Sequence, residues 1–178
     1  TFREEYHITE ERILESLFED PDFSAEESKK IVDEKNGRMI GFIGVKVSHN
    51  EQLYPASAWI SIFAVKKEEQ GKGYGTMVLN QVCQSLHKNG INKIYVGQDF
   101  NNFFSGIPDP DEGKEIFFKK NGFTLNRDRH FDLEADITDN RLIDSFDTSS
   151  FDKEFTVASY KDNKKELLGF LEREFPGR

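Results

Sequence analysis

One stretch decides the fold, and it reads Val65-Lys66-Lys67-Glu68-Glu69-Gln70-Gly71-Lys72-Gly73-Tyr74-Gly75. An apolar run rich in β-forming residues, Ala58–Val65, precedes it, and a helical pattern over Thr76–Lys88 follows it. Glycines at alternate positions let the backbone turn sharply and direct several N–H groups toward one point. The following helix adds its own unpaired N–H groups and the positive end of its dipole. The stretch therefore predicts an anion site suited to a pyrophosphate, with three nearby lysines supplying positive charge.

The spacing of these glycines narrows the choice of phosphate ligand. The nucleoside-triphosphate loop requires Gly-Lys followed by Ser or Thr, a sequence that the chain lacks. The dinucleotide fingerprint requires G-x-G-x-x-G in a first βαβ unit, whereas these glycines run G-x-G-x-G after several expected strands. Both nucleotide-binding classes are therefore disfavoured.

Before this stretch we expect a short helical region and a hairpin. Thr9 can cap a helix whose apolar residues share one face, and Ser24 with Glu27 fits a capping box that predicts a second short helix. The apolar residues of the first helix are Ile13, Leu14, Leu17 and Phe18. Asn36-Gly37 between Ile31–Lys35 and Met39–Val47 is typical of a β-hairpin turn. Ala58–Val65 is apolar on both faces, which indicates a central strand.

After the stretch, the pattern continues with shorter elements. We expect a strand over Ile91–Val96, a long Phe-rich loop from Asp99 to Glu112, and a helix over Lys114–Lys120 closed by Asn121-Gly122. Phe123–Leu125 and His130–Ala135 are expected as a final pair of strands. The predicted fold class is α/β (α+β), with a mixed, mostly antiparallel central sheet flanked by helices.

Composition and charge exclude several classes of protein. The 178 residues include 17 Phe, enough aromatic surface to build a core. The net charge of -9 argues against nucleic acid and anionic membranes as partners, because both require a basic face. A single cysteine, Cys83, excludes an intramolecular disulfide. The four histidines have no metal-ligand spacing, so no metal is expected. The default location is the cytoplasm.

The strand, the Q-x-x-G-x-G loop and the following helix resemble the acetyl-CoA signature of the GCN5-related N-acetyltransferase (GNAT) superfamily. The order of elements, including a short helix that ends in Asn121-Gly122-Phe123, is similar over about residues 6 to 136. The resemblance implies an acyl-CoA N-acyltransferase-like fold. It also implies direct transfer of an acetyl group from acetyl-CoA to a primary amine in a ternary complex, with a small molecule or a peptide as acceptor.

The resemblance assigns site residues by position. The pantetheine arm would lie along Phe63, Ala64 and Val65, where the central strand diverges from Ile91–Val96. The pyrophosphate would be held by the main-chain N–H groups of Gln70, Gly71, Lys72, Gly73, Tyr74, Gly75 and Thr76. Asp99, at the end of the strand next to the thioester site, is the candidate base.

One position departs from the family pattern. In many relatives a tyrosine in the short helix protonates the leaving thiolate, and the matching residue here is Phe118, which has no proton to give. Another donor or water could serve instead. The alternative is a non-catalytic module that binds acetyl-CoA or CoA beside a tandem partner domain.

The C-terminal quarter predicts a separate organisation. We expect an acetyltransferase-like domain over residues 1–137, a linker over 138–154, and a strand-helix piece over 155–178 that opens a second domain. A strand at Phe155–Tyr160 and a helix at Asn163–Phe175 are too little to bury a core alone. A second copy of the chain could pair with this segment, which would give a homodimer.

Overall fold

The computed structural model describes residues 8–99, 101–102, 106–107, 112–125 and 163–175. The chain divides into two compact units, Thr1–Arg127 and Asp128–Arg178, and each is described by itself. In the part of the chain that is described, no helix has the length and apolar character needed to cross a bilayer.

The first unit contains a four-stranded sheet in the order β1-β2-β3-β4. Its strands are β1 (Lys29–Asp33), β2 (Arg38–Val47), β3 (Ser57–Val65) and β4 (Lys93–Val96). The first three strands run antiparallel, and β4 pairs with β3 in parallel. The turn between β1 and β2 contains Gly37 at φ 69°, as the hairpin motif predicts. The mixed, mostly antiparallel sheet is confirmed.

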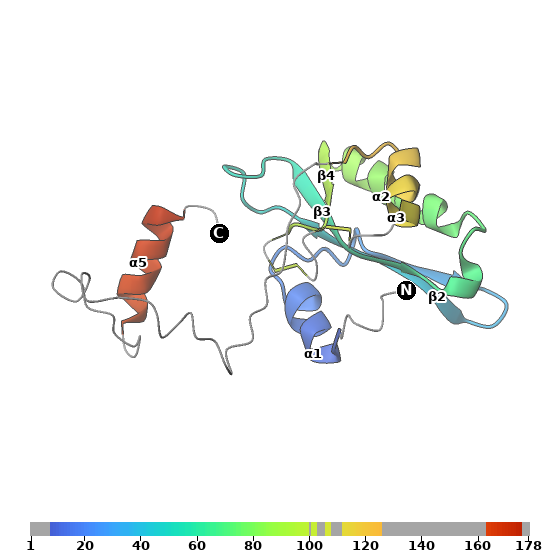
Figure 1. Ribbon diagram of the computed structural model, residues 1–178, viewed down its shortest axis with the longest axis horizontal. Helices are drawn as coiled ribbons and strands as arrows, with labels where there is room; N and C mark the ends of the chain where they lie inside the picture. Colours follow the sequence, from blue (N-terminus) through green and yellow to red (C-terminus); the bar gives the residue numbers. More distant parts are fainter. Residues whose placement is uncertain (1–7, 100, 103–105, 108–111, 126–162, 176–178) are drawn as a thin grey trace, which may run out of the picture. The chain divides into compact units, whose positions relative to one another are not determined.

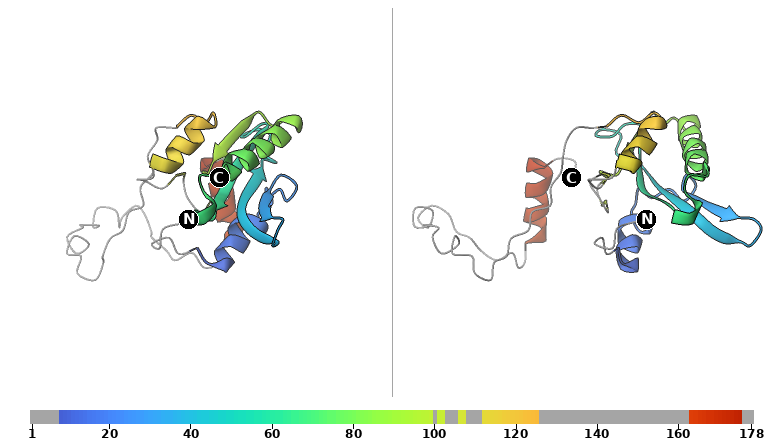
Figure 2. Two further views of the ribbon diagram at one scale, coloured as in Figure 1. Left: turned by 90° about the vertical axis from the view of Figure 1, so that its right-hand side faces the viewer. Right: turned by 45° about the vertical axis from the view of Figure 1, so that its right-hand side comes forward.

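Helices cover both faces of this sheet (Figures 1 and 2). A short α-helix, α1 (Glu10–Ile13), continues into a π-helix, η1 (Leu14–Phe18), on one face. Helices α2 (Tyr74–Lys88) and α3 (Glu112–Lys120) lie on the other face. A 3-10 turn, η2 (Lys67–Glu69), lies within the glycine-containing stretch. Both α2 and α3 begin two residues earlier than the sequence predicts.

The main core forms between α2 and the sheet. One stripe of α2 is buried, as its apolar spacing predicts, and the strand residues opposite are equally inaccessible. The helix residues are Val78, Leu79, Val82 and Leu86, and the strand residues are Ile43, Val45, Ala58 and Ile60. Cys83 packs beside this core, and burial raises the pKa of its thiol. Cys83 is therefore a packing residue with little thiolate character.

On the opposite face, the π-helix approaches the sheet closely. Leu17 is fully buried there. A Cβ atom added at Gly44 would lie 3.0 Å from Leu17 Cδ2 and 2.6 Å from Ile62 Cγ2. Gly44 on β2 therefore leaves the room that lets η1 dock on the sheet.

Two expected elements are wrong. Ser24–Glu27 forms a turn instead of a helix: Ser24 Oγ accepts from Glu27 N at 3.2 Å, but the strand β1 begins at Lys29, before a helix can continue. Phe123–Leu125 has no strand pairing. The helix expected at Asn163–Phe175 is confirmed as α5 (Lys164–Glu174).

The remaining expectations for the C-terminal part lie outside the described residues. They are the strands at His130–Ala135 and Phe155–Tyr160 and the linker over 138–154. The proposed second domain and the homodimer stay predictions.

We predict that the α2 core dominates stability. Leu86→Ala should lower the free energy of unfolding by about 2–5 kcal/mol, because Leu86 is fully buried and its truncation leaves a cavity. Met77→Ala on the same helix is the matched control, since Met77 is 47% exposed. Urea denaturation of both variants measures the difference, and equal losses would contradict this view of the core.

Candidate functional site

The glycine-containing turn after β3 has the backbone that its sequence predicts. Gly71 and Gly73 have φ of 74° and 88°, in the left-handed region that favours glycine. A Cβ atom added at either position would meet no atom within 4 Å. The glycines are thus required by backbone conformation, and the space beside them is open to a ligand.

Helix α2 begins directly at this turn. Its first internal hydrogen bond runs from Met77 N to Gly73 O at 3.0 Å. The N–H groups of Tyr74, Gly75 and Thr76 precede that bond and have no acceptor within the helix. Their partial positive charge, added to the helix dipole, creates a site that favours an anion.

Two side chains shape the turn itself. Gln70 Nε2 donates to Val65 O at 2.9 Å and so fastens the turn to the end of β3. Lys72 Nζ lies 2.9 Å from Glu69 Oε2, and this hydrogen bond raises the pKa of the exposed Lys72 ammonium. Lys72 is therefore fully charged at neutral pH, but it faces a carboxylate that would compete with a phosphate.

The strands β3 and β4 separate beyond Ile60. Their pairing runs from Ser57 to Ile60, and the last bond is from Gly97 N to Ile60 O at 2.9 Å. The second half of β3, residues 61–65, thus has a main-chain edge that β4 does not cover. Such an edge can accept an extended, strand-like ligand.

The register shows which residues present that edge. Lys66 N donates to Ile40 O at 2.8 Å, and bonded positions alternate along an antiparallel pair. Ala64 therefore bonds to β2, whereas Phe63 and Val65 direct their main-chain groups to the uncovered side. Of these groups, the Val65 carbonyl is already occupied by Gln70.

Asp99 lies two residues after Gly97 and is 3% exposed. Its Oδ1 accepts a hydrogen bond from Lys46 Nζ at 2.6 Å, and Lys46 on β2 is itself 1% exposed. Lys46 also contacts Asp20 Oδ2 at 3.0 Å. Among the described residues, Asp99 Oδ2 has no hydrogen-bond partner although it is buried. One oxygen of the candidate base is thus fixed by Lys46.

The segment after Asp99 is tied to the helical region near the N-terminus. Arg12 donates to Asn102 O at 3.1 Å, Asn101 Nδ2 donates to Glu15 O at 2.9 Å, and Ser16 Oγ donates to Asn101 Oδ1 at 3.4 Å. The helical region near the N-terminus and the start of the segment after β4 are therefore in contact.

Phe118 lies in an aromatic cluster. Its ring centroid is 6.2 Å from that of Phe63, 5.2 Å from that of Phe117 and 5.4 Å from that of Phe123. With 9% exposure, Phe118 links α3 to the uncovered part of β3. Its role is packing beside the strand edge, and it offers no polar atom.

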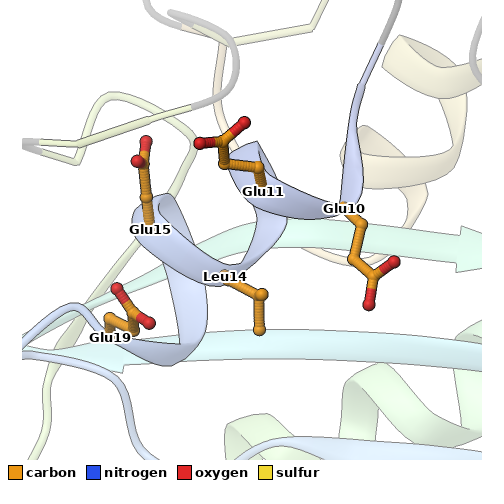
Figure 3. A pocket seen from close by; sticks show the side chains of 5 residues that line it. All are labelled: Glu10, Glu11, Leu14, Glu15 and Glu19. Carbon is orange, nitrogen blue, oxygen red and sulfur yellow. The ribbon is translucent and has the colours of Figure 1, made fainter.

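An open, acidic hollow of about 530 Å³ lies over α1 and η1 (Figure 3). Four glutamates, Glu10, Glu11, Glu15 and Glu19, surround Leu14 there. Figure 3 shows Glu11 and Glu15 extending to the same side of the helix. The hollow belongs to a different element from the glycine turn, so anion-binding and cation-attracting surfaces are separate in this unit.

Sequence reasoning missed Lys46 and Asp20. A lysine within the apolar run Met39–Val47 was a signal, because a buried charge in a strand needs a partner. The partners could not be identified, since Asp20 and Asp99 are distant in sequence. Ser61 was also missed: its Oγ is buried without a partner among the described residues, at the point where β3 and β4 separate.

The fold and the site together define a class of protein, a GNAT-type acyltransferase. A family model described as the acetyltransferase (GNAT) family matches residues 1–105. This match covers more than half of the chain, and the chain belongs to that family. No curated protein matches the sequence.

Several solved structures share the fold. A fungal multi-domain GH3 β-N-acetylglucosaminidase with a GCN5-related glucosamine N-acetyltransferase region matches with a TM-score of 0.60 at 22% identity. The match covers 70% of this chain but only 14% of that protein. The acetyltransferase YycN of Bacillus subtilis matches with a TM-score of 0.52 at 15% identity, covering 71% and 73% of the two chains.

An aminoglycoside acetyltransferase from an uncultured soil metagenomic sample is similar as well. It matches with a TM-score of 0.51 at 16% identity, and the match covers 75% of this chain and 80% of that one. At such identities the likeness shows the fold alone. The family match confirms the resemblance to the GNAT superfamily that the sequence indicates.

We predict that Gly73 is required for its left-handed backbone conformation and not because a Cβ atom would lack room there. Gly73→Ala should lower the free energy of unfolding by about 1–2 kcal/mol, the cost of a left-handed residue with a Cβ atom. Gly75→Ala should be neutral or stabilising, because Gly75 is in the first turn of α2 and its Cβ would contact Phe117 at an ordinary 3.5 Å. Thermal and urea unfolding compare the two, and equal effects would contradict the assignment.

Proposed function

We propose that the protein transfers an acetyl group from acetyl-CoA to a primary amine. The observation that carries this proposal is the uncovered edge of β3 running directly into the glycine turn and the N-terminus of α2. These features lie in the same order as the pantetheine arm and the pyrophosphate of CoA. A strand-like pantetheine arm suits the edge at Phe63 and Val65, and a pyrophosphate suits the N–H groups of residues 70–76.

In this proposal, the chain's residues bind and orient the reactants and move protons. Attack by the amine nitrogen on the thioester carbonyl forms the C–N bond and breaks the C–S bond in one ternary complex. Asp99 accepts through Oδ2 the proton that the ammonium loses before attack. The thiolate takes up a proton from water, because Phe118 cannot supply one.

A cationic acceptor is the class that the surface favours. The acidic hollow over α1 and η1 lies on an element that contacts the Asp99–Asn102 segment. The carboxylates of this hollow would attract an amine in its charged form and raise its local concentration. A cytoplasmic location stays a prediction of the sequence.

The second candidate function is a non-catalytic acetyl-CoA-binding module. It is favoured by one observation, the burial of Phe118 at the position where many relatives have a tyrosine. Such a module would use the same strand edge and glycine turn but would release no CoA when an amine is added.

We predict that acetyl-CoA raises the melting temperature by several degrees. A ligand at about 100 times its Kd stabilises the native state by about 2.7 kcal/mol. Gly73→Val should abolish the shift, because the side chain occupies open space beside the turn and changes its backbone. Retention of the full shift would overturn the assigned site. Free thiol released with a panel of primary amines distinguishes the enzyme from the binding module.

We predict that Glu69 weakens CoA binding. Glu69→Gln should lower the Kd for CoA by about two- to fivefold, because the charged Lys72 ammonium then loses the carboxylate that it contacts. The gain should shrink at high salt, which screens exposed charges. Glu51→Gln, before the start of β3, changes net charge equally and serves as control. Isothermal titration calorimetry measures both, and equal changes would contradict a role for Lys72.

A further inference from the structure

We propose that Lys46 is a positioning residue for the acceptor side of this site. The inference rests on the proposed function, because it concerns how Asp99 is held as a base. Lys46 lies on β2, at a register position opposite Trp59 of β3, and its ammonium contacts Asp20, which follows η1. Its side chain is 1% exposed, so its ammonium has to be satisfied by the protein.

The ammonium has three N–H donors and three protein acceptors. Nζ lies 2.6 Å from Asp99 Oδ1, 3.0 Å from Asp20 Oδ2 and 3.5 Å from Asn101 O. One group on β2 thus joins the end of η1 to the segment that follows β4.

The two carboxylate oxygens of Asp99 differ in their contacts. Lys46 fixes Oδ1, and the main chain around Asp99 is held by Asn102 Nδ2, which donates to Asp99 O at 2.8 Å. Among the described residues, Oδ2 has no partner. A carboxylate anchored by one oxygen has a defined orientation, which suits a group that receives a proton.

The cluster also carries an uncompensated charge. Two carboxylates face one ammonium, so the buried group has a net charge of −1. Among the described residues, the charged groups hydrogen-bonded in this cluster are Lys46 from β2, Asp99 and Asp20 after η1; Asn101 contributes only a neutral oxygen. The ammonium of an acceptor would complete the charge balance when it binds.

The test uses Asp20→Asn as the reference background. Adding Lys46→Met to it leaves Asp99 as the only charge, which keeps the native net charge of −1 and avoids two unpaired buried carboxylates. Turnover should fall at least tenfold relative to the reference, while KM for acetyl-CoA and the acetyl-CoA thermal shift stay unchanged. The acidic limb of the kcat/KM profile should move to higher pH, since removing a neighbouring opposite charge disfavours the ionised form of a carboxyl group. Lys46→Arg in the same background should return the limb toward the reference.

A purely structural role for Lys46 would give a different result. Turnover would then fall in proportion to the loss of melting temperature, with no movement of the pH limb, and that outcome would overturn the proposal. Titration of the Asp99 carboxyl by ¹³C NMR, in the same variants, reports on Lys46 without any reaction. If the wild-type protein releases no CoA with any amine, the proposed function fails, while an Asp99 titration unmoved by Lys46→Met would sink the inference about Lys46.

Discussion

The unequal pairing of β3 is the constraint on which the rest of the site depends. On one side β3 bonds to β2 along its whole length, and on the other side β4 bonds only as far as Ile60. Unpaired main-chain groups in a sheet need another partner or water. In the second half of β3, the main-chain groups of Phe63 and Val65 face the edge that β4 leaves uncovered, where water or a ligand can bond to them. Directly after this edge, the chain enters the glycine turn and the N-terminus of α2.

Where β3 and β4 separate, two regions are stabilised in different ways. The glycine turn after β3 presents main-chain N–H groups and needs no buried charge. The chain after β4, near η1, has to be held in place by side chains because strand pairing has ended. Lys46 and Asp99 provide this hold, and removing one partner of such a buried pair typically costs about 3–5 kcal/mol. A hydrophobic replacement of the whole cluster could be as stable, so stability alone does not explain these charges.

Local patterns predicted the parts of the fold that depend on near neighbours. The Asn36-Gly37 turn, the apolar stripe of α2 and the left-handed glycines follow from residues a few positions apart. The Ser24–Glu27 capping box shows the limit of this reasoning. Its hydrogen bond forms, but pairing of Lys29 with Ile43 draws the chain into β1 before a helix can continue.

The candidate site likewise has one part that depends on near neighbours in the sequence and one part that depends on distant residues. The proposed anion site is a single continuous stretch, so its glycine spacing was visible in the sequence. The Lys46 cluster joins residues 26 and 53 positions apart, and no spacing rule connects them. A lysine in an apolar strand shows only that a partner exists. In this family member, the anion site proposed for CoA is therefore encoded locally, whereas the proposed acceptor side depends on tertiary contacts that the fold has to assemble first.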